Sequence, residues 1–167
     1  MSEISERLQA VAGSFGGRVR EIEDLRGGAA YEADTDIAHD FLVRLKQDEV
    51  GKFHFLVFLT AHDNYLDEPR FAVVYMVRSL ENNLDVRVNV PLPGEDPELS
   101  TVTDIWPAAN WMEREVYDMF GIRFKGHPDL TRILMWEGFE GWPLRKDYPL
   151  LGNTPGTPGH VGKGGKR

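Results

Sequence analysis

The first third of the chain alternates between helical and extended hydrophobic spacing. Apolar residues recur at the period of a helix over residues 2–12, and Gly13 is a typical stop for that helix. Its apolar residues are Ile4, Leu8, Val11 and Ala12. Residues 18–23 and 29–33 are predicted as two short strands on either side of the Gly27-Gly28 turn.

A second apolar stripe predicts an amphipathic helix between Thr35 and Gly51. Thr35 is a suitable N-cap residue, and Asp36 in the first turn suits the positive end of the helix dipole. Lys46 lies near the predicted end, before Gly51. The stripe consists of Ile37, Phe41, Leu42 and Leu45.

Three longer strands are predicted in the middle of the chain. Residues 53–60 and 70–78 are apolar on both faces, which is typical of central strands. Residues 84–90 alternate strictly between apolar and polar positions, as an antiparallel strand with one wet face does. Asn82-Asn83 is a plausible hairpin turn before that strand. The prolines that we expect to end the sheet are Pro91, Pro93 and Pro97.

A third helix is predicted after the sheet. Thr101 and Asp104 have the spacing of a capping box, and Pro107 suits the first turn of a helix. Gly121 is expected to end it. The apolar face of this helix consists of Ala109, Met112, Val116, Met119 and Phe120.

These elements together predict an α+β fold, in which a small, mostly antiparallel sheet packs with about three helices and a long irregular C-terminal arm follows. We divide the chain into an α+β domain over residues 1–125, an irregular segment over residues 126–150 that we call the clamp, and a tail over residues 151–167 that is rich in Gly and Pro. No internal repeat is visible.

The composition of the chain excludes several kinds of binding site. The 167 residues include no cysteine, which excludes disulfides, thiolate-held iron–sulfur clusters and Cys-type zinc sites. The net charge of −8 argues against nucleic-acid binding. The tail is basic, with Lys163, Lys166 and Arg167 and no acid. It either docks on an anionic partner surface or is simply solvated.

The sequence shows neither a signal peptide nor a membrane span. The first six residues are acidic and no apolar segment of signal-peptide type follows. The apolar runs 53–59 and 71–77 are far too short to cross a bilayer. We therefore expect any contact with a membrane to be made through partner proteins.

Known catalytic motifs are missing. There is no GxGxxG between a strand and a helix, no P-loop and no GxSxG elbow. None of the five histidines has HExxH spacing; His39 and His54 fit structural roles, and His62-Asp63 is a weak metal candidate.

The densest polar cluster lies on the third predicted helix. Arg114 and Asp118 are four residues apart and can pair, whereas Glu115 is expected at or near the apolar face. A carboxylate there needs a partner, for which the candidates are Arg132, Arg145 and Lys146. An acid/base pair of Glu115 with His127 is possible. A buried ion-pair network that fixes an irregular loop to the helix is the favoured interpretation.

The clamp combines a turn of restricted geometry with large aromatic side chains. Pro128 restricts the turn around His127. The rings of Trp136, Phe139 and Trp142 need a surface to pack on, either this domain or another protein. The run from Pro143 to Pro149 places charges between prolines, as a rigid extended segment does.

From Ala109 to Leu150 the sequence resembles the family of the 30-kDa (C-type) subunit of bacterial NADH:quinone oxidoreductase, respiratory complex I. The match runs through ANWMEREVYDMFGI, GHPDL, RIL, GFEG and PLRKDYPL, and it is almost unbroken. It departs at Thr131, where a basic residue is common, which puts one ion pair of the clamp in doubt. It departs also at Trp142, where His is common, which weakens any role for a histidine there in handling protons.

The resemblance implies a scaffold subunit of the peripheral, quinone-reducing arm of that complex. Such a subunit packs on the quinone-site (49-kDa, D-type) subunit and on neighbouring Fe–S subunits, at the cytoplasmic face of the plasma membrane. It carries no cofactor; FMN, Fe–S clusters and quinone are expected on the partners, through which electrons pass from NADH to quinone with proton pumping. The residues expected at structural or interface positions are Glu113, Arg114, Glu115, Asp118, His127, Arg132, Arg145, Lys146 and Asp147.

Two alternatives stay open at this point. The chain can be the equivalent subunit of a membrane-bound hydrogenase or of an F420H2- or ferredoxin-linked dehydrogenase. It can also be a free-standing acid/base or metal enzyme that uses Glu115, Asp118 and His127.

Overall fold

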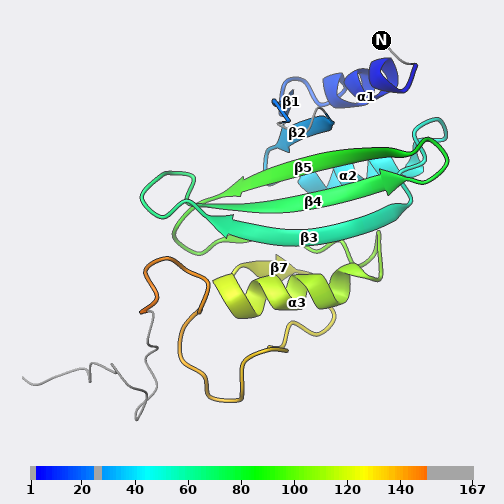
Figure 1. Ribbon diagram of the computed structural model, residues 1–167. Helices are drawn as coiled ribbons and strands as arrows, with labels where there is room; N and C mark the ends of the chain where they lie inside the picture. The colour runs from blue at the N-terminus through cyan, green and yellow to red at the C-terminus, as the bar shows by residue number, and fades with distance from the viewer. Residues whose placement is uncertain (1–2, 25–27, 150–167) are drawn as a thin grey trace, which may run out of the picture.

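The computed structural model describes residues 3–24 and 28–149, so the prediction for the tail lies outside the described residues. Within them the fold is α+β, as predicted (Figure 1). The helices are α1 (Glu3–Gly13), α2 (Ala38–Gln47) and α3 (Ala109–Phe120). The strands are β1 (Val19–Glu21), β2 (Ala29–Ala33), β3 (Phe55–Asp63), β4 (Phe71–Ser79), β5 (Leu84–Leu92), β6 (Glu98–Ser100) and β7 (Arg123–Lys125).

Five strands form one sheet in the order β1-β2-β5-β4-β3, and all its pairs are antiparallel except β2 with β5. The prediction of β4 as a central strand is confirmed, but β3 lies at the edge of the sheet. Its apolar residues on both faces were misleading because one of its faces is open to solvent, where Phe55 is 52% and Phe58 37% exposed. No signal in the sequence indicated the short parallel pair β6–β7.

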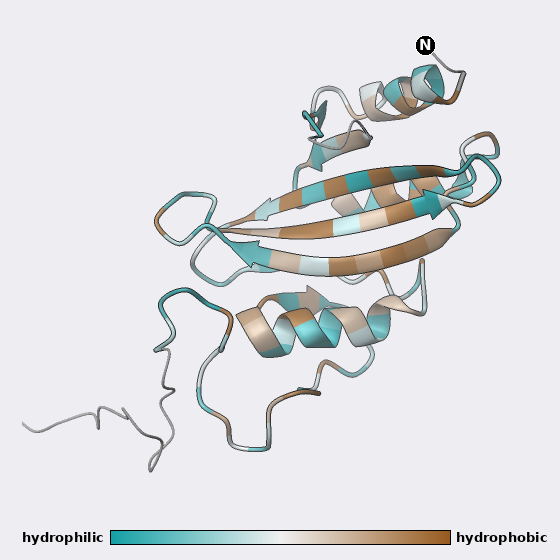
Figure 2. Cartoon of the chain, viewed as in Figure 1, coloured by the Kyte–Doolittle hydropathy of each residue, from teal (hydrophilic) through white to brown (hydrophobic). Residues whose placement is uncertain are grey.

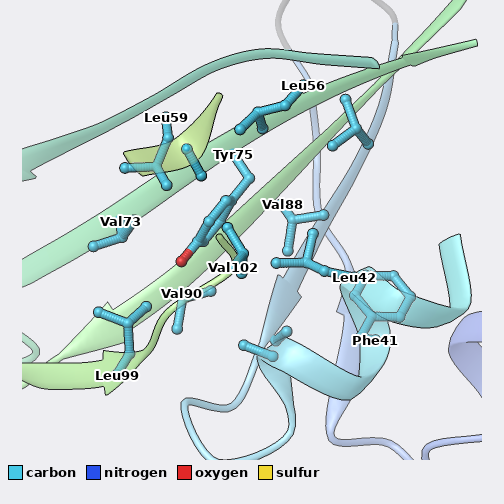
Figure 3. Close-up of a cluster of buried hydrophobic side chains, with 14 of the residues drawn as sticks. Phe41, Leu42, Leu56, Leu59, Val73, Tyr75, Val88, Val90, Leu99 and Val102 are labelled. Carbon is cyan, nitrogen blue, oxygen red and sulfur yellow. The ribbon is translucent and has the colours of Figure 1, made fainter. Parts of the chain in front are cut away.

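One face of the sheet carries the core, and α2 lies behind it in Figure 1. Figure 3 shows Phe41 and Leu42 of α2 near side chains from β4 and β5, with Tyr75 in the middle of the cluster. Both α2 side chains have no exposed surface. Burying a side chain of this kind stabilises the fold by about 1.5–3 kcal/mol. The alternation of β5 that places its valines in this core is visible as alternating bands in Figure 2.

Two predicted helix starts are wrong, for related reasons. Thr35 does not cap α2, because its hydroxyl donates to the Pro91 carbonyl at 2.8 Å and the N-cap position is Ile37. Asp36 is paired with Arg18. Thr101 does not start α3, which begins eight residues later at Ala109. In both cases the hydroxyl makes a long-range contact instead of a local cap.

The predicted end of α3 is confirmed. Gly121 has φ 73, a left-handed conformation that glycine adopts without strain, and its N–H donates to the Tyr117 carbonyl. A Cβ atom at this position would lie 2.5 Å from the Trp142 ring, so glycine is needed for space as well as for conformation. No helix in the described ranges is long and apolar enough to span a membrane.

Candidate functional site at the junction of helix α3 and the clamp

The clamp packs back on α3 and supplies partners for its last carbonyl groups. The Leu144 N–H donates to the Met119 carbonyl at 3.1 Å, and Arg145 Nε donates to the Phe120 carbonyl at 2.6 Å. A helix end leaves such carbonyls without partners inside the helix, and a cation there also suits the helix dipole. Burial, and then the neighbouring Arg70, lower the pKa of Arg145. The run from Pro143 to Pro149, which the sequence predicts as an extended segment, therefore binds the end of α3 in the same chain.

Trp142 closes this junction. Its ring meets Tyr117 edge-on at 5.3 Å between centroids, and the Arg132 guanidinium lies 4.3 Å from its centre. Such contacts add about 0.5–1.5 kcal/mol each beyond burial. Of the two surfaces that the sequence left open for the aromatic rings, Trp142 uses its own domain, whereas Trp136 stays 58% exposed.

Asp118 is a buried carboxylate with a full set of partners. Its Oδ1 accepts from Arg132 Nη1 at 3.1 Å. Its Oδ2 accepts three consecutive backbone N–H groups, from Ile133, Leu134 and Met135, at 2.7–3.0 Å. The sequence favoured an ion-pair network between helix and loop with Arg132 as a candidate partner of Glu115, whereas Arg132 pairs with Asp118. The clamp is held here by one side chain.

The predicted pair of Arg114 with Asp118 does not form. Arg114 instead donates from Nε to the Thr131 carbonyl at 3.0 Å and from Nη2 to the Thr131 hydroxyl at 2.9 Å. The spacing of four residues allowed a pair, but the clamp offers both side chains better-oriented partners. Thr131, a departure from the family pattern, is thus an acceptor for arginine.

Glu113, rather than Glu115, is the carboxyl group that faces the core. Glu113 has no exposed surface, whereas Glu115 is exposed. Glu113 accepts the Thr101 hydroxyl at 2.6 Å and the Val102 N–H at 2.7 Å. Burial raises the pKa of Glu113 to about 7, although these two hydrogen bonds oppose the rise. The prediction that Glu115 lies at or near the apolar face is wrong, because Glu113 and Glu115 lie on nearly opposite sides of the helix and the segment that carries Thr101 packs on the Glu113 side.

His127 lies beside Glu113, and its ring is held by backbone groups on both sides. The Nε2 atom is 3.9 Å from the Glu113 carboxylate and 3.2 Å from the Asn110 carbonyl. Its Nδ1 is 3.0 Å from the Asp129 backbone N, which donates to it. The ring therefore fixes the predicted turn to the start of α3.

A separate set of ion pairs, which the sequence did not indicate, ties the clamp to the sheet. Arg70 binds two carboxylates in bidentate fashion, Asp63 and Asp147, with all four distances between 2.9 and 3.1 Å. Asp63 also accepts the backbone N–H of Lys146 at 2.8 Å. The Arg70 guanidinium holds the pKa of Asp63 well below its usual range, and that of Asp147 is also lowered. The Lys146 side chain is exposed.

These contacts remove the acid/base hypothesis for this region. Glu115 is exposed on the outside of α3, Asp118 is bound to the clamp, and His127 is bound to the Asn110 carbonyl and the Asp129 N–H, so the three do not share a site. The weak metal candidate at His62-Asp63 fails as well, because both Asp63 oxygens are engaged by Arg70. Within residues 3–24 and 28–149, no cluster of three His, Asp or Glu side chains could hold a metal ion.

Comparison with known proteins agrees with this architecture. A family model described as "Respiratory-chain NADH dehydrogenase, 30 Kd subunit" matches residues 31–154. This chain belongs to that family. The match begins within β2 and includes the strands that follow it, α3 and the clamp.

Relatives and solved structures are similar over most of the chain. The NADH-quinone oxidoreductase C-2 subunit of Rhizobium meliloti (strain 1021) is 48% identical over 145 residues, 87% of this chain and 79% of the relative. A protein of Acidiphilium cryptum (strain JF-5), whose name joins the C and D subunits, is 48% identical over 122 residues, 69% of this chain and 21% of that protein. The solved trypsin-resistant fragment (1–134) of Nqo5 is 35% identical, with a TM-score of 0.66, and covers 75% of this chain and 98% of the fragment.

Proposed function

We propose that this member of the 30-kDa family is a non-catalytic scaffold subunit of the peripheral arm of NADH:quinone oxidoreductase. The observation that carries the proposal is how its charged groups are used. Asp118, Arg132 and Arg145 bind helix and clamp to one another, and Asp147 binds the clamp to the sheet. These charged side chains therefore bind parts of the same chain to one another and keep its surface rigid, as a scaffold subunit requires.

Redox chemistry in this proposal belongs to the partner subunits. FMN, Fe–S clusters and quinone would be bound there, and electrons would pass from NADH to quinone with proton translocation. The absence of cysteine from the sequence supports this division, since thiolate ligands hold most Fe–S clusters. The protein would lie at the cytoplasmic face of the membrane and contact it through partners. The hydrogenase-type alternative is less favoured, because the matching family and the C-type relatives are NADH dehydrogenase proteins.

The partner that we propose for the clamp side is the quinone-site (49-kDa, D-type) subunit. The Acidiphilium cryptum relative with the joined C/D name supports this choice, because one chain there carries both names. A fusion keeps two proteins at equal number and close together. Neighbouring Fe–S subunits would complete the surroundings.

We propose that four exposed side chains, which we call the aromatic face, bind that partner: Trp111, Leu134, Trp136 and Leu144. Each of these side chains is between 54% and 64% exposed. Trp136 borders a hollow of about 490 Å³ between α3 and the clamp, and Arg114 stacks 5.0 Å from the Trp111 ring centre. Exposed aromatic residues beside arginine are typical of the energetic centre of a protein interface.

Purification of the assembled complex from cells that carry Trp136→Ala tests this proposal. We expect less D-type subunit to co-purify with the variant, because a side chain at the centre of an interface is typically worth about 2 kcal/mol or more. Leu80→Ala is the matched control, since Leu80 is 69% exposed just after β4 and is not part of the aromatic face. Equal recovery of the D-type subunit with both variants would contradict the proposed interface.

A further inference from the structure

The buried carboxyl group of Glu113 lies at the inner end of a chain of hydrogen bonds that leads outward through two threonines. Glu113 Oε2 accepts the Thr101 hydroxyl at 2.6 Å, and Glu113 Oε1 accepts the Val102 N–H at 2.7 Å. The Thr101 and Thr103 hydroxyl oxygens are 3.0 Å apart, and either one can donate to the other. Glu113 has no exposed surface, whereas Thr103 is half-buried. The threonines therefore connect a buried acid with the surface.

The other sides of the Glu113 carboxyl group are enclosed. The His127 side chain of the clamp, 3.9 Å away at Nε2, has no exposed surface either. Figure 3 shows Val102, whose N–H binds Glu113, among the buried side chains around Tyr75 of β4. Within the described part of the chain, the hydrogen-bonded route from this carboxyl group to the surface therefore runs through the two threonine hydroxyls.

Thr101 is placed so that its hydroxyl group serves Glu113 in both protonation states. A threonine hydroxyl donates one hydrogen bond and accepts two. When Glu113 is ionised, the Thr101 hydroxyl donates to it and accepts the Thr103 N–H, at 3.2 Å, and the Thr103 O–H. When Glu113 is protonated, Thr101 accepts the Glu113 O–H and the Thr103 N–H and donates to the Thr103 oxygen. All three positions of the Thr101 hydroxyl are filled in either state.

Among the described residues, four other titratable groups surround Glu113. His127 comes from the clamp, and Tyr75 comes from β4, where burial and then the Glu113 charge raise the pKa of Tyr75. Asp104 of the segment before α3 is paired with His39 of α2 at 2.9 Å. Burial raises the pKa of Glu113 to about 7; two hydrogen bonds and His39 oppose the rise, and Asp104 adds to it. Both protonation states of Glu113 are therefore populated near neutral pH.

We propose that Thr103, Thr101 and Glu113 form a proton relay that reverses the direction of its hydrogen bonds when Glu113 takes up a proton. Solvent supplies a proton to the Thr103 hydroxyl, the Thr103 proton passes to Thr101, and the Thr101 proton passes to the Glu113 carboxylate. One proton enters and one negative charge disappears. The Thr103 hydroxyl donates inward while Glu113 is ionised and outward afterwards, so a group bound at Thr103 would sense the protonation state of Glu113. The relay does not depend on the proposed scaffold function.

NMR titration of the isolated full chain, with ¹³C-labelled glutamate, tests the relay. The Glu113 carboxyl signal is assigned by its loss in Glu113→Gln. In Thr103→Val the protonated form loses the acceptor for the Thr101 hydroxyl, so the midpoint of the Glu113 titration should move to lower pH by about 0.7, the equivalent of one hydrogen bond. Thr103→Ser keeps the hydroxyl and is the matched control, with an unchanged midpoint. Equal midpoints in the valine variant and the wild type would overturn the relay.

The rate of proton exchange distinguishes a relay from occasional opening of the segment before α3. The line width of the Glu113 signal at the midpoint of the titration measures this rate. Without the Thr103 hydroxyl, exchange should slow at least about fivefold, the equivalent of one hydrogen bond removed from the path. The same rate in Thr103→Val and Thr103→Ser would mean that the proton reaches Glu113 by another route, which would refute the relay.

Thermal unfolding separates loss of the relay from a general structural defect. At pH 5, where Glu113 is protonated, Thr103→Val leaves the Thr101 donor without a partner, so the melting temperature should fall by about 2–4 °C. At pH 8 Thr101 still donates to the ionised Glu113, and the deficit should be smaller. Thr103→Ala also lacks the hydroxyl and should lose the same difference between the two pH values. A deficit that is equal at both pH values in both variants would contradict the proposal.

Discussion

Helix α3 carries two buried carboxyl groups, and they differ in how the unfavourable burial of a negative charge is compensated. Asp118, near its C-terminal end, has an arginine and three backbone N–H groups as partners. Glu113, near its start, has one hydroxyl and one backbone N–H as hydrogen-bond partners, and the His127 Nε2 atom is 3.9 Å away. The charge of Asp118 is thus matched by its donors, whereas burial raises the pKa of Glu113 to about 7.

The difference teaches that burial alone does not fix what a carboxyl group does for a fold. Asp118 organises the clamp because its charge is matched by donors that the clamp supplies. Glu113 joins the segment before α3 to the helix, but its charged form is unfavourable there. The nearby Asp104 raises the pKa of Glu113 further, while His39 lowers it. Four substitutions, taken from the largest expected effect to the smallest, sharpen this contrast.

Asp118→Ala should be the most damaging substitution. It leaves Arg132 half-buried without its carboxylate and frees three backbone N–H groups, so we expect a loss of about 3–5 kcal/mol in the free energy of unfolding. Chemical denaturation measures the loss. Trypsin should then cleave after Arg132 faster than in the wild type. A clamp that stays equally protected would show that the aromatic contacts, rather than Asp118, hold it.

Glu113→Gln should change the pH dependence of stability. Since the pKa of Glu113 is raised from 4.5 to about 7 on folding, its contribution is complete below pH 4.5 and is lost as the pH rises to about 7. The variant should therefore gain about 3 kcal/mol relative to the wild type between pH 4.5 and pH 8. The new glutamine side chain can keep the Val102 N–H bond and donate to the Thr101 hydroxyl.

The comparison with the wild type is necessary because His62 contributes to the pH dependence of stability with the opposite sign. Burial lowers the pKa of His62, so its contribution to stability is lost as the pH falls. Taking the difference between Glu113→Gln and the wild type cancels that contribution. If the free energy of unfolding of the variant and of the wild type changed in parallel from pH 5 to pH 8, Glu113 would be ionised in the folded protein over that whole range.

Asp147→Asn should have a smaller effect, because Asp147 is paired with Arg70 but is 47% exposed. Such an ion pair contributes about 0.2–1 kcal/mol, which salt reduces. The pKa of Asp147 is lowered, so the sign is opposite to that of Glu113: the deficit of the variant should disappear as the pH falls through the acidic range. Thermal melting at pH 7 and at low pH, at two salt concentrations, measures this.

Glu115→Ala is the control for the whole series. Glu115 lies on the same helix but is exposed, so the free energy of unfolding should change by no more than about 0.5 kcal/mol at any pH. A larger loss in the isolated chain would mean that Glu115 has a structural role that its exposure does not reveal.

The sequence predicted most helices and strands of this fold correctly, but not which elements and side chains pack against one another. The two-sided hydrophobicity of β3 suggested a central strand, yet one of its faces meets solvent and no described strand pairs with its outer edge. Thr35 and Thr101 looked like helix caps because local spacing cannot show that their hydroxyls reach Pro91 and Glu113. A polar side chain chooses between local and distant partners only when the chain has folded.

The candidate site shows the same division. The predicted set contained both Asp118 and Arg132, but the sequence paired Asp118 with Arg114 and offered Arg132 to Glu115, and the Asp118–Arg132 pair appeared only in the folded chain. Asp63 and Arg70 were missed, because Arg70 meets Asp147 across 77 residues of chain. A turn between two strands gave no hint that its charges would meet a distant loop.

The sequence by itself indicated the three helices, the five strands of the main sheet, where α3 ends and to which family the chain belongs. These properties depend on periodicity, on a glycine at a left-handed position and on a long ordered motif, all of which are local. The tertiary structure alone decided which acidic group of α3 is buried, that Arg70 joins the clamp to the sheet, and that Thr101 and Thr103 connect the buried Glu113 with the surface. Those outcomes depend on which distant segments pack together, and burial then sets the energy of every charge between them.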